Sequence, residues 1–269
     1  MCDHRTLYTG LSLILAASLV VPGAALAQDP DDWCDEWRDR DRGYACEVRE
    51  YMLDARDLVA VDAAPNGGIH VEAWDRNEIR VLARVSAHDD TDAEARELVE
   101  RVEVVTSGRS IRSDGPRTRG HRSWSVSFRV YVPARSNLDL ESTNGGISVD
   151  GIAGDIRFHT TNGGVTLDAV GGDVRGGTTN GSLRVTLAGS TWQGSGLDVE
   201  TTNGGVRLEI PDGYNAHLVT GTTNGGMRFD FPVTVQGRIN RRLSVDLGAG
   251  GPTIRVMTTN GGVVVQRSE

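Results

Sequence analysis

The sequence has no lysine, so all 28 of its basic side chains are arginine. We attribute this absence to the coding bias of a GC-rich genome and draw no functional conclusion from it. Acidic residues number 37, and the resulting net charge of −9 excludes nucleic acid and anionic membranes as principal partners. Aromatic residues make up only 5% of the chain, whereas 34 of its 269 residues are glycine, well above the usual level of about 7%. This composition favours many tight turns over a thick globular core.

Long apolar runs are also lacking, except near the N-terminus. Residues 11–21 are apolar, Arg5 precedes them, and small residues lead up to Ala27 and Gln28. This pattern predicts a secretory signal peptide over residues 1–27, cleaved between Ala27 and Gln28. A transmembrane anchor is disfavoured because the run is short for a bilayer and a Pro-Gly pair interrupts it. We therefore expect an exported protein, in the periplasm or at the cell surface, with no transmembrane segment in the mature chain.

Cysteine is scarce. Cys2 lies in the expected signal peptide, which leaves Cys34 and Cys46. Because exported proteins meet oxidising conditions, this pair predicts a disulfide, with two free thiols as the alternative. Closing a loop of this length contributes about 3 kcal/mol in the chain-entropy model. Two cysteines without a nearby histidine do not make a zinc ligand set, and no cysteine directly follows the apolar run. Neither a metal site nor a lipid anchor is therefore expected.

A Thr-Asn-Gly turn recurs six times in the C-terminal half, with Asn-to-Asn spacings of 18, 18, 23, 21 and 36 residues. We attribute the spacings of 23 and 21 to small loop insertions near Gly194 and Gly213. The last spacing is twice 18, and we interpret it as a coil that has lost its Asn-Gly. Asn and Gly both tolerate positive φ, so we expect these residues to be structural turns. The turn pairs are Asn144-Gly145, Asn162-Gly163, Asn180-Gly181, Asn203-Gly204, Asn224-Gly225 and Asn260-Gly261.

Apolar and polar residues alternate between the turns, as in Ile147, Ser148 and Val149. This alternation predicts strands with one buried face. Asn-Gly between alternating runs is also a hairpin signal, which would give an antiparallel meander. The same turn with the same flanking Thr in every repeat instead favours a β-solenoid of about 18-residue coils over residues 137–269, because stacked coils place equivalent residues on top of one another. Stacked Thr and Asn side chains would then form ladders from coil to coil.

The region before the repeats is different in character. Residues 28–45 are acidic, and we expect them to be mobile. Residues 46–136 are interpreted as a β-rich cap over one end of the solenoid, with a single helix at residues 91–104. Thr91 and Glu94 form the capping box of that helix. Strands are expected at residues 48–53, 58–61, 69–73, 79–85 and 123–132, and Pro-Asn-Gly-Gly at residues 65–68 is interpreted as an outlying repeat.

The repeats, together with the Cys46-Glu-Val-Arg-Glu entry and the Gly67-Gly-Ile-x-Val-x-x-Trp-Asp segment, resemble a known bacterial family. Its members are described as candidate adhesins, with a β-strand-repeat domain of unknown function. The resemblance covers residues 46–268. It implies an exported β-solenoid protein, and it supplies no catalytic residues to carry over.

Candidate catalytic and metal-binding residues are few. Residues 39–47 resemble an extracellular calcium motif, but Arg40 and Arg42 stand at positions where they would repel a cation. The chain lacks a nucleophile elbow, a His-Glu-x-x-His motif and a phosphate-binding loop. Its histidines after the expected signal peptide are scattered, at His70, His88, His121, His159 and His217. We therefore expect no catalytic residue, no cofactor and no metal.

Two groups of charged residues remain as weaker candidates. Equivalent positions of two coils carry Asp150 with Asp168 and Asp155 with Asp173, and glycosidases need paired carboxylates. An Asp beside Gly is nevertheless an ordinary turn residue. A basic stretch could contact anionic glycans or phosphate groups, or be a solvated loop. It consists of Arg109, Arg112, Arg117, Arg119, His121 and Arg122.

These observations favour a non-enzymatic exported module of the cell envelope or surface, adhesin-like or scaffolding. Its partner would be an unidentified envelope component, either a glycan or a protein. A periplasmic binding or stress-sensing module is the alternative, and a carbohydrate-active enzyme built on a β-helix is a third hypothesis.

Overall fold

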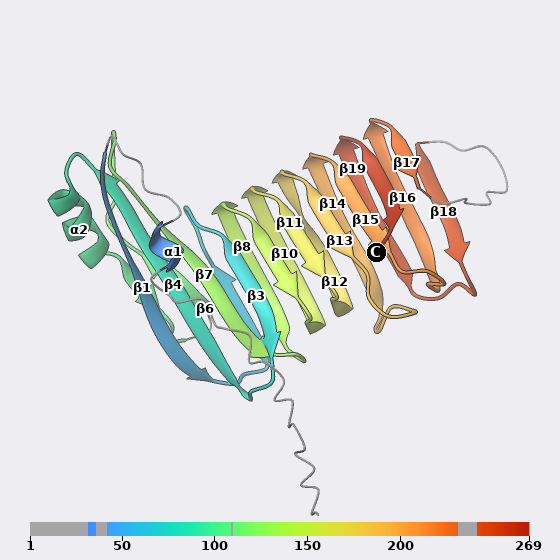
Figure 1. Ribbon diagram of the computed structural model, residues 1–269, viewed down its shortest axis with the longest axis horizontal. Coiled ribbons are helices and arrows are strands. Elements are labelled where there is room, and N and C mark those ends of the chain that lie inside the picture. The colour runs from blue at the N-terminus through green and yellow to red at the C-terminus, as the bar shows by residue number, and fades with distance from the viewer. Residues whose placement is uncertain (1–31, 36–41, 109, 231–240, 269) are drawn as a thin grey trace, which may run out of the picture.

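The computed structural model describes residues 32–35, 42–108, 110–230 and 241–268 (Figure 1). Within these residues the chain forms two helices and two ten-stranded sheets, which confirms the expected all-β class. The first sheet has the order β1 (Gly43–Asp54), β4 (Glu78–Asp89), β7 (Ser123–Pro133), β3 (Ile69–Trp74), β9 (Ile147–Asp150), β11 (Val165–Asp168), β13 (Leu183–Thr186), β15 (Val206–Ile210), β20 (Val263–Arg267) and β17 (Met227–Phe229). The second has the order β18 (Arg242–Leu247), β16 (Ala216–Asn224), β19 (Thr253–Asn260), β14 (Gly196–Asn203), β12 (Gly171–Asn180), β10 (Ala153–Asn162), β8 (Asn137–Asn144), β2 (Leu58–Asp62), β6 (Ser110–Asp114) and β5 (Glu103–Val105).

One apolar core runs along the molecule between the two sheets. Val59 of β2 and Val265 of β20, near opposite ends of the stack, belong to the same buried cluster. Alternate residues of each strand point into it, as the alternation in the sequence predicts. Neighbouring coils also compensate each other in size, because a Cβ on Gly176 would lie 2.7 Å from the ring of Phe158 in the next strand.

Strands that are one repeat apart pair in parallel in both sheets. Asn162 of β10 lies opposite Asn144 of β8, and Val165 of β11 lies opposite Ile147 of β9. Successive strands from β8 to β15 alternate between the two sheets. A meander would pair consecutive strands antiparallel, so that alternative is excluded for this part of the chain. The outlying motif at residues 65–68 lies in the same stack, since Asn66 forms a parallel bridge with Asn144.

The last three repeats are not stacked in the order of the sequence. β19 pairs with both β14 and β16, so the final strand pair, β19 and β20, lies between the pair β14 and β15 and the pair β16 and β17 (Figure 1). The chain between Asn224 and Asn260 includes β18, which runs antiparallel along the outer edge of β16. The 36-residue spacing is therefore not a coil that lost its Asn-Gly, and that interpretation was wrong. The expected insertions near Gly194 and Gly213 are present, between β13 and β14 and between β15 and β16.

The N-terminal end of the first sheet is antiparallel, with β4 between β1 and β7. All five strands expected in this region are present, as β1, β2, β3, β4 and β7. The helix α2 (Asp92–Glu100) packs on β1 and β4. Thr91 caps it, because its hydroxyl accepts a hydrogen bond from the backbone N–H of Glu94 at 3.2 Å. The helix is shorter than the expected 91–104, since residues 103–105 form β5 at the edge of the second sheet.

The short helix α1 (Asp32–Asp35) is docked on the first sheet. Cys34 forms the expected disulfide with Cys46, and the guanidinium groups of Arg84 and Arg129 both lie over the Trp33 ring, at 5.1 and 4.8 Å from its centroid. The mobility expected for residues 28–45, which include α1, stays a prediction. The predicted signal peptide and its cleavage point at Ala27 and Gln28 lie outside the described residues. No helix in the described part of the chain has the length and apolarity to span a bilayer.

Candidate functional site

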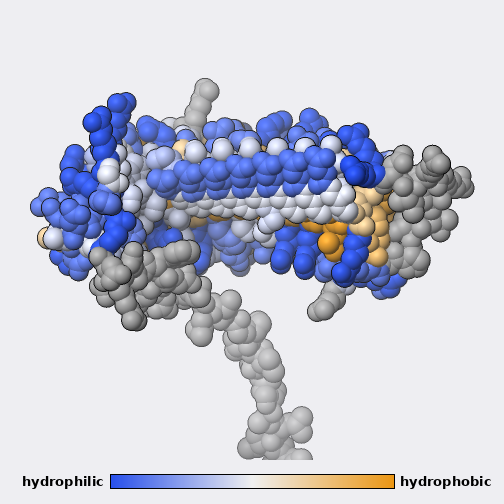
Figure 2. All heavy atoms as spheres, turned by 90° about the horizontal axis from the view of Figure 1, so that it is seen from above, coloured by the Kyte–Doolittle hydropathy of each residue, from blue (hydrophilic) through white to orange (hydrophobic). Residues whose placement is uncertain are grey.

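The Asn-Gly turns line up along one edge of the stack. Seen from above, this edge is a straight hydrophilic row with paler rows beside it (Figure 2). We call it the ridge, and define it as the ladder asparagines with the residue before each, which is Thr except for Pro65, and the Gly after each. In the order of the stack, each of six asparagines donates from Nδ2 to Oδ1 of the preceding one. The bonds run from Asn144 to Asn66 (3.0 Å), Asn162 to Asn144 (2.9 Å), Asn180 to Asn162 (2.8 Å), Asn203 to Asn180 (2.9 Å), Asn260 to Asn203 (2.8 Å) and Asn224 to Asn260 (2.8 Å).

The ladder has a fixed direction. Its first member, Asn66, donates from Nδ2 to the backbone carbonyl of Trp124 at 3.4 Å. Because a carbonyl oxygen can only accept, Asn66 must turn its amide nitrogen towards Trp124, and every later asparagine follows the same sense. Each rung uses one amide hydrogen and one oxygen lone pair in the ladder, so one donor and one acceptor remain for solvent or a ligand. Asn144 is the exception, because its amide nitrogen also donates to the Pro65 carbonyl at 3.0 Å and only its acceptor remains. These groups recur at the inter-strand spacing of about 4.8 Å.

A second ladder lies beneath the ridge and involves the residue two before each asparagine. Thr160 and Thr178 are buried, and their hydroxyls donate to the carbonyls of Gly145 and Gly163 in the preceding coil at 2.8 and 2.7 Å. Equivalent bonds join Ser142 to Gly67, Thr201 to Gly181, Thr258 to Gly204 and Thr222 to Gly261. Only the Thr adjacent to each Asn was expected to take part in a ladder. The doubled Thr-Thr of five repeats was the signal that could have revealed the buried row.

The glycine that follows Asn in each repeat is required by close approach of the neighbouring backbone rather than by positive φ. No Asn or Gly of the six turns is among the positive-φ residues of the described chain, so the expectation of positive φ was wrong. Instead, a Cβ on Gly163 would lie 2.0 Å from the carbonyl oxygen of Gly145. The same 2.0 Å clash occurs at Gly145, Gly181, Gly204, Gly225 and Gly261. The second glycine is under less constraint, because Ser182 occupies that place in one repeat and a Cβ on Gly164 would be 3.4 Å from Ser182 O.

The outer surface of the ridge is polar and open to water. Thr143, Thr202, Thr223 and Thr259 are exposed beside the exposed ladder asparagines, while Thr161 is half-buried. Thr hydroxyls, Asn side-chain amides and glycine backbone therefore repeat along the straight, flat ridge. The two ladders fix the positions of these groups. Such a surface is suited to binding a regular, hydroxyl-rich polymer by repeated hydrogen bonds, and it holds no group that titrates near neutral pH.

Residues 102–266, more than half of the chain, match the model of the Toastrack family, DUF4097. The chain belongs to the Toastrack family. This match bears out the resemblance drawn from the repeats.

Solved structures give a likeness at the level of the fold. A candidate cell adhesion protein from Clostridium sporogenes is 9% identical, with a TM-score of 0.50 over 83% of this chain and 100% of that one. A candidate adhesin from Bacteroides fragilis is 9% identical with a TM-score of 0.32, over 83% and 97% of the two chains. A candidate lipid binding protein from Parabacteroides distasonis is 10% identical with a TM-score of 0.26, over 83% and 97%. The comparison with curated proteins found no match.

The paired aspartates of this Toastrack chain lie where the repeat places them. Asp155 is opposite Asp173, but each carboxylate is bound by an arginine of its own strand, Arg157 at 3.0 Å and Arg175 at 2.9 Å. Asp150 and Asp168 are opposite each other at the ends of β9 and β11. Each of Asp155 and Asp173 thus has a cationic partner on the exposed face of its own strand. We therefore interpret Asp155 and Asp173 as members of two separate surface ion pairs, with Arg157 and Arg175.

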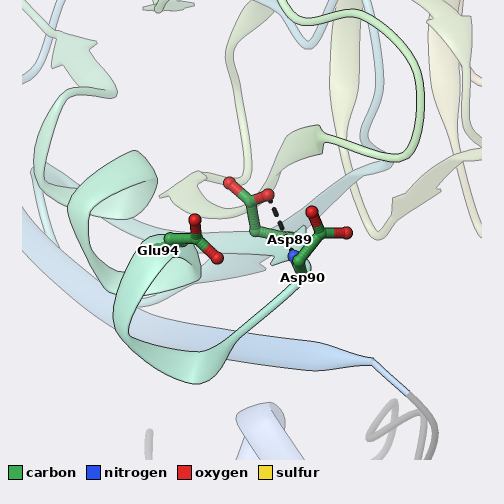
Figure 3. Close-up of side chains that lie close together, drawn as sticks. All are labelled: Asp89, Asp90 and Glu94. Carbon is green, nitrogen blue, oxygen red and sulfur yellow. Dashed lines mark hydrogen bonds between the residues drawn. The ribbon is translucent and has the colours of Figure 1, made fainter.

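An acidic cluster lies where β4 leads into α2. Asp89, Asp90 and Glu94 are close together there (Figure 3). The buried carboxylate of Asp89 is paired with Arg122 at 2.7 Å, and Glu94 accepts a hydrogen bond from the Thr91 hydroxyl at 2.8 Å. Since the charge of Asp89 is compensated and Glu94 takes part in the helix cap, we assign no metal to this cluster. Of the calcium-like motif, residues 39–41 lie outside the described chain and Cys46 is in the disulfide.

Ser244, His217 and Asp246 form a hydrogen-bonded chain across β16 and β18. Nδ1 of His217 lies 2.7 Å from Asp246 Oδ1, and its Nε2 lies 3.0 Å from Ser244 Oγ. The connectivity is that of a nucleophilic triad, but acyl transfer also requires oriented donors in a water-excluded site, and the Asp246 side chain is 68% exposed. His217 faces Asp246 directly in the antiparallel register. We therefore interpret these residues as a contact that fastens the edge strand β18 to β16.

Proposed function

We propose that this chain is an exported, non-enzymatic module of the cell envelope that binds a hydroxyl-rich polymer along the ridge, in an adhesin-like or scaffolding role. The observation that carries the proposal is the continuous ladder of seven asparagines, which holds an exposed row of donors and acceptors at regular spacing. A polymer with regularly repeated hydroxyls would gain affinity by engaging several rungs at once, because later contacts are intramolecular.

We interpret the stack as a β-solenoid of about 18-residue coils, closed at its N-terminal end by the antiparallel strands and α2. The parallel register of β8, β10 and β12 supports this interpretation, since Asn144, Asn162 and Asn180 lie in line at separations of 18 residues. A solenoid suits a binding role because its surface is fixed in advance. A polymer would meet a ridge that needs no ordering, which lowers the entropic cost of association.

Export is supported by the disulfide between Cys34 and Cys46, since such bonds persist in oxidising compartments. It is also the expectation from the signal-like residues 1–27. The likeness in fold to a candidate cell adhesion protein is compatible with an envelope role, although a shared fold does not fix a function.

The ridge is tested by blocking it with bulk at exposed positions. A variant with Thr143, Thr202 and Thr259 each changed to Lys should lose at least tenfold in affinity for any polysaccharide that binds the native chain. The matched control changes the exposed residues Ala188, Ser190 and Ser195 to Lys at the opposite edge of the stack, which adds the same charge. Both variants and the native chain are compared for retention on a panel of immobilised polysaccharides. Equal loss in the two variants, or retention by the ridge variant, would exclude the ridge as the binding surface.

The compartment is tested by protease treatment of intact cells that express the chain with a C-terminal tag, with osmotically lysed cells as the control. Loss of the tag from intact cells supports a surface role in adhesion. Survival of the tag until lysis supports the alternative of a periplasmic binding or stress-sensing module, and would make the adhesin description wrong for this chain.

A further inference from the structure

A hollow of about 470 Å³ opens at the N-terminal end of the ridge. Asn66, the first member of the asparagine ladder, lies in its wall, so a polymer that follows the ridge towards that end meets the hollow directly. Its lining includes Asn66, Ser113, Asp114, Arg117, Arg119 and Trp124.

The loop that forms the outer wall of the hollow is anchored at several points. The Ser113 hydroxyl donates to the Ala64 carbonyl at 3.3 Å, and Nε1 of the buried Trp124 donates to the Pro116 carbonyl at 2.8 Å. After the loop, Arg122 pairs with the buried Asp89 at 2.7 Å. The hollow is therefore a built feature of the cap, held between the first turn of the stack and the strand β7.

Two basic side chains of the hollow carry uncompensated charge. Arg117 and Arg119 are exposed, and neither has an ion pair or hydrogen bond with any residue in the described part of the chain. By contrast, arginines on the sheet faces, such as Arg157 and Arg175, are paired with carboxylates. Asp114 is the one acidic residue in the lining, so two positive charges face one negative charge. In a chain with a net charge of −9, this local excess of positive charge is a separate recognition feature.

The asparagine ladder adds to the attraction for an anion at this end. All its amides have nitrogen towards the hollow and oxygen away from it, because Asn66 donates to the Trp124 carbonyl. Aligned amide dipoles place their positive end at the nitrogen side, and hydrogen bonds in a chain polarise one another. The ladder therefore acts in the same direction as Arg117 and Arg119.

We propose that this hollow binds an anionic group of the polymer that occupies the ridge, so that the ligand class is an acidic polysaccharide such as a polyuronate. The inference rests on the proposed function of the ridge and extends it. The ridge contacts the hydroxyls, whereas Arg117 and Arg119 bind a carboxylate through charge-assisted hydrogen bonds. The hollow thereby sets both the charge preference and the direction of the bound chain.

The test compares an oligogalacturonate with its methyl ester, which keeps the hydroxyls and removes the charge. Affinities for both are measured by calorimetry at low salt with the full chain, with the variant R117Q/R119Q and with the control R157Q/R175Q. The control removes two exposed arginines from the face of the second sheet. We expect the native chain and the control to bind the acid at least tenfold more tightly than the ester. The double variant should bind both ligands equally, with unchanged affinity for the ester.

Each other result overturns a defined part of the account. Equal binding of acid and ester by the native chain, or a preference for the acid that survives in R117Q/R119Q, refutes the role of the hollow and leaves the ridge proposal intact. Loss of ester binding in R117Q/R119Q would show that the loop acts on the ridge itself, which also refutes charge recognition. Absence of binding of both ligands to the native chain would contradict the ridge proposal for this polymer class, and the inference with it.

Discussion

Replacing Gly163 with Ala should destabilise the protein strongly, although it adds a single methyl group at an exposed edge. The new Cβ would lie 2.0 Å from the carbonyl oxygen of Gly145 and 2.4 Å from its carbonyl carbon. The contact could be relieved only by moving two coils apart by about 1 Å, and overpacking of this kind costs about 1–3 kcal/mol. The same movement strains the backbone bond from Gly145 N to Asn162 O, now 2.9 Å, which adds about 1 kcal/mol.

The expected loss in free energy of unfolding is therefore about 3 kcal/mol. This corresponds to a fall in Tm of about 6–12 °C for a chain of this size. Gly164→Ala is the matched control, since its Cβ would be 3.4 Å from Ser182 O, and it should stay within about 0.5 kcal/mol of the native protein. Urea unfolding followed by circular dichroism measures both. If the two variants are equally stable, the inter-coil contact does not explain the recurring glycine.

Three further predictions concern stability. Thr178→Val removes the buried hydroxyl that donates to Gly163 O at 2.7 Å, and should lower the free energy of unfolding by about 1–2 kcal/mol in urea titrations; an unchanged value would mean that the second ladder contributes nothing. Tyr214 is buried, and burial raises its pKa to about 12, so ionisation favours the unfolded chain from about pH 10 upwards. Stability should therefore fall between pH 10 and 12 in the native protein, with a smaller fall in Tyr214→Phe, and identical pH profiles would contradict the buried phenol. Replacing Cys34 and Cys46 together with Ser should cost about 3 kcal/mol through loop closure, and the thermal midpoint under non-reducing conditions tests this, with no change contradicting the bond.

The strands and their faces could be predicted from the sequence because they depend on local pattern. Alternation in segments such as residues 147–149 specifies which side chains enter the core, and the cap strands followed from the same signal. The helix was placed by Thr91 and Glu94, but its end was not, because residues 103–105 pair with β6. Antiparallel pairing with β6, the next strand along the chain, overrides the helix preference of these residues.

The spatial order of the coils could not be predicted. A spacing of 36 residues is compatible with a degenerate coil and equally with an edge strand followed by an inserted coil. The difference lies in β18, whose antiparallel pairing with β16 is a long-range contact. The same pairing brings Ser244 and Asp246 to His217, which stood in the sequence only as one of five scattered histidines.

The stacked asparagines of the candidate site were predicted from the sequence, but the reason given for the glycine beside them was wrong. The sequence indicated stacked asparagines, and the ladder from Asn66 to Asn224 is the result. Positive φ was the wrong explanation for the glycine, because the constraint comes from the neighbouring coil and exists only once coils are stacked. The basic stretch was noticed, but its division into an anchor, Arg122, and the free Arg117 and Arg119 depends on the folded loop.

The central claim, that the ridge is the binding surface, is tested most directly by the side-chain amide signals of asparagine in a nitrogen-15 NMR spectrum. Methyl-esterified oligogalacturonate is added to the labelled chain, and the signals are assigned by single Asn substitutions. The account predicts that the signals of Asn144, Asn162 and Asn180 move together, while those of Asn137 and Asn215, at the opposite edge, stay in place. If the amide signals of Asn137 or Asn215 shift while those of the ladder asparagines do not, the ridge is not the binding surface.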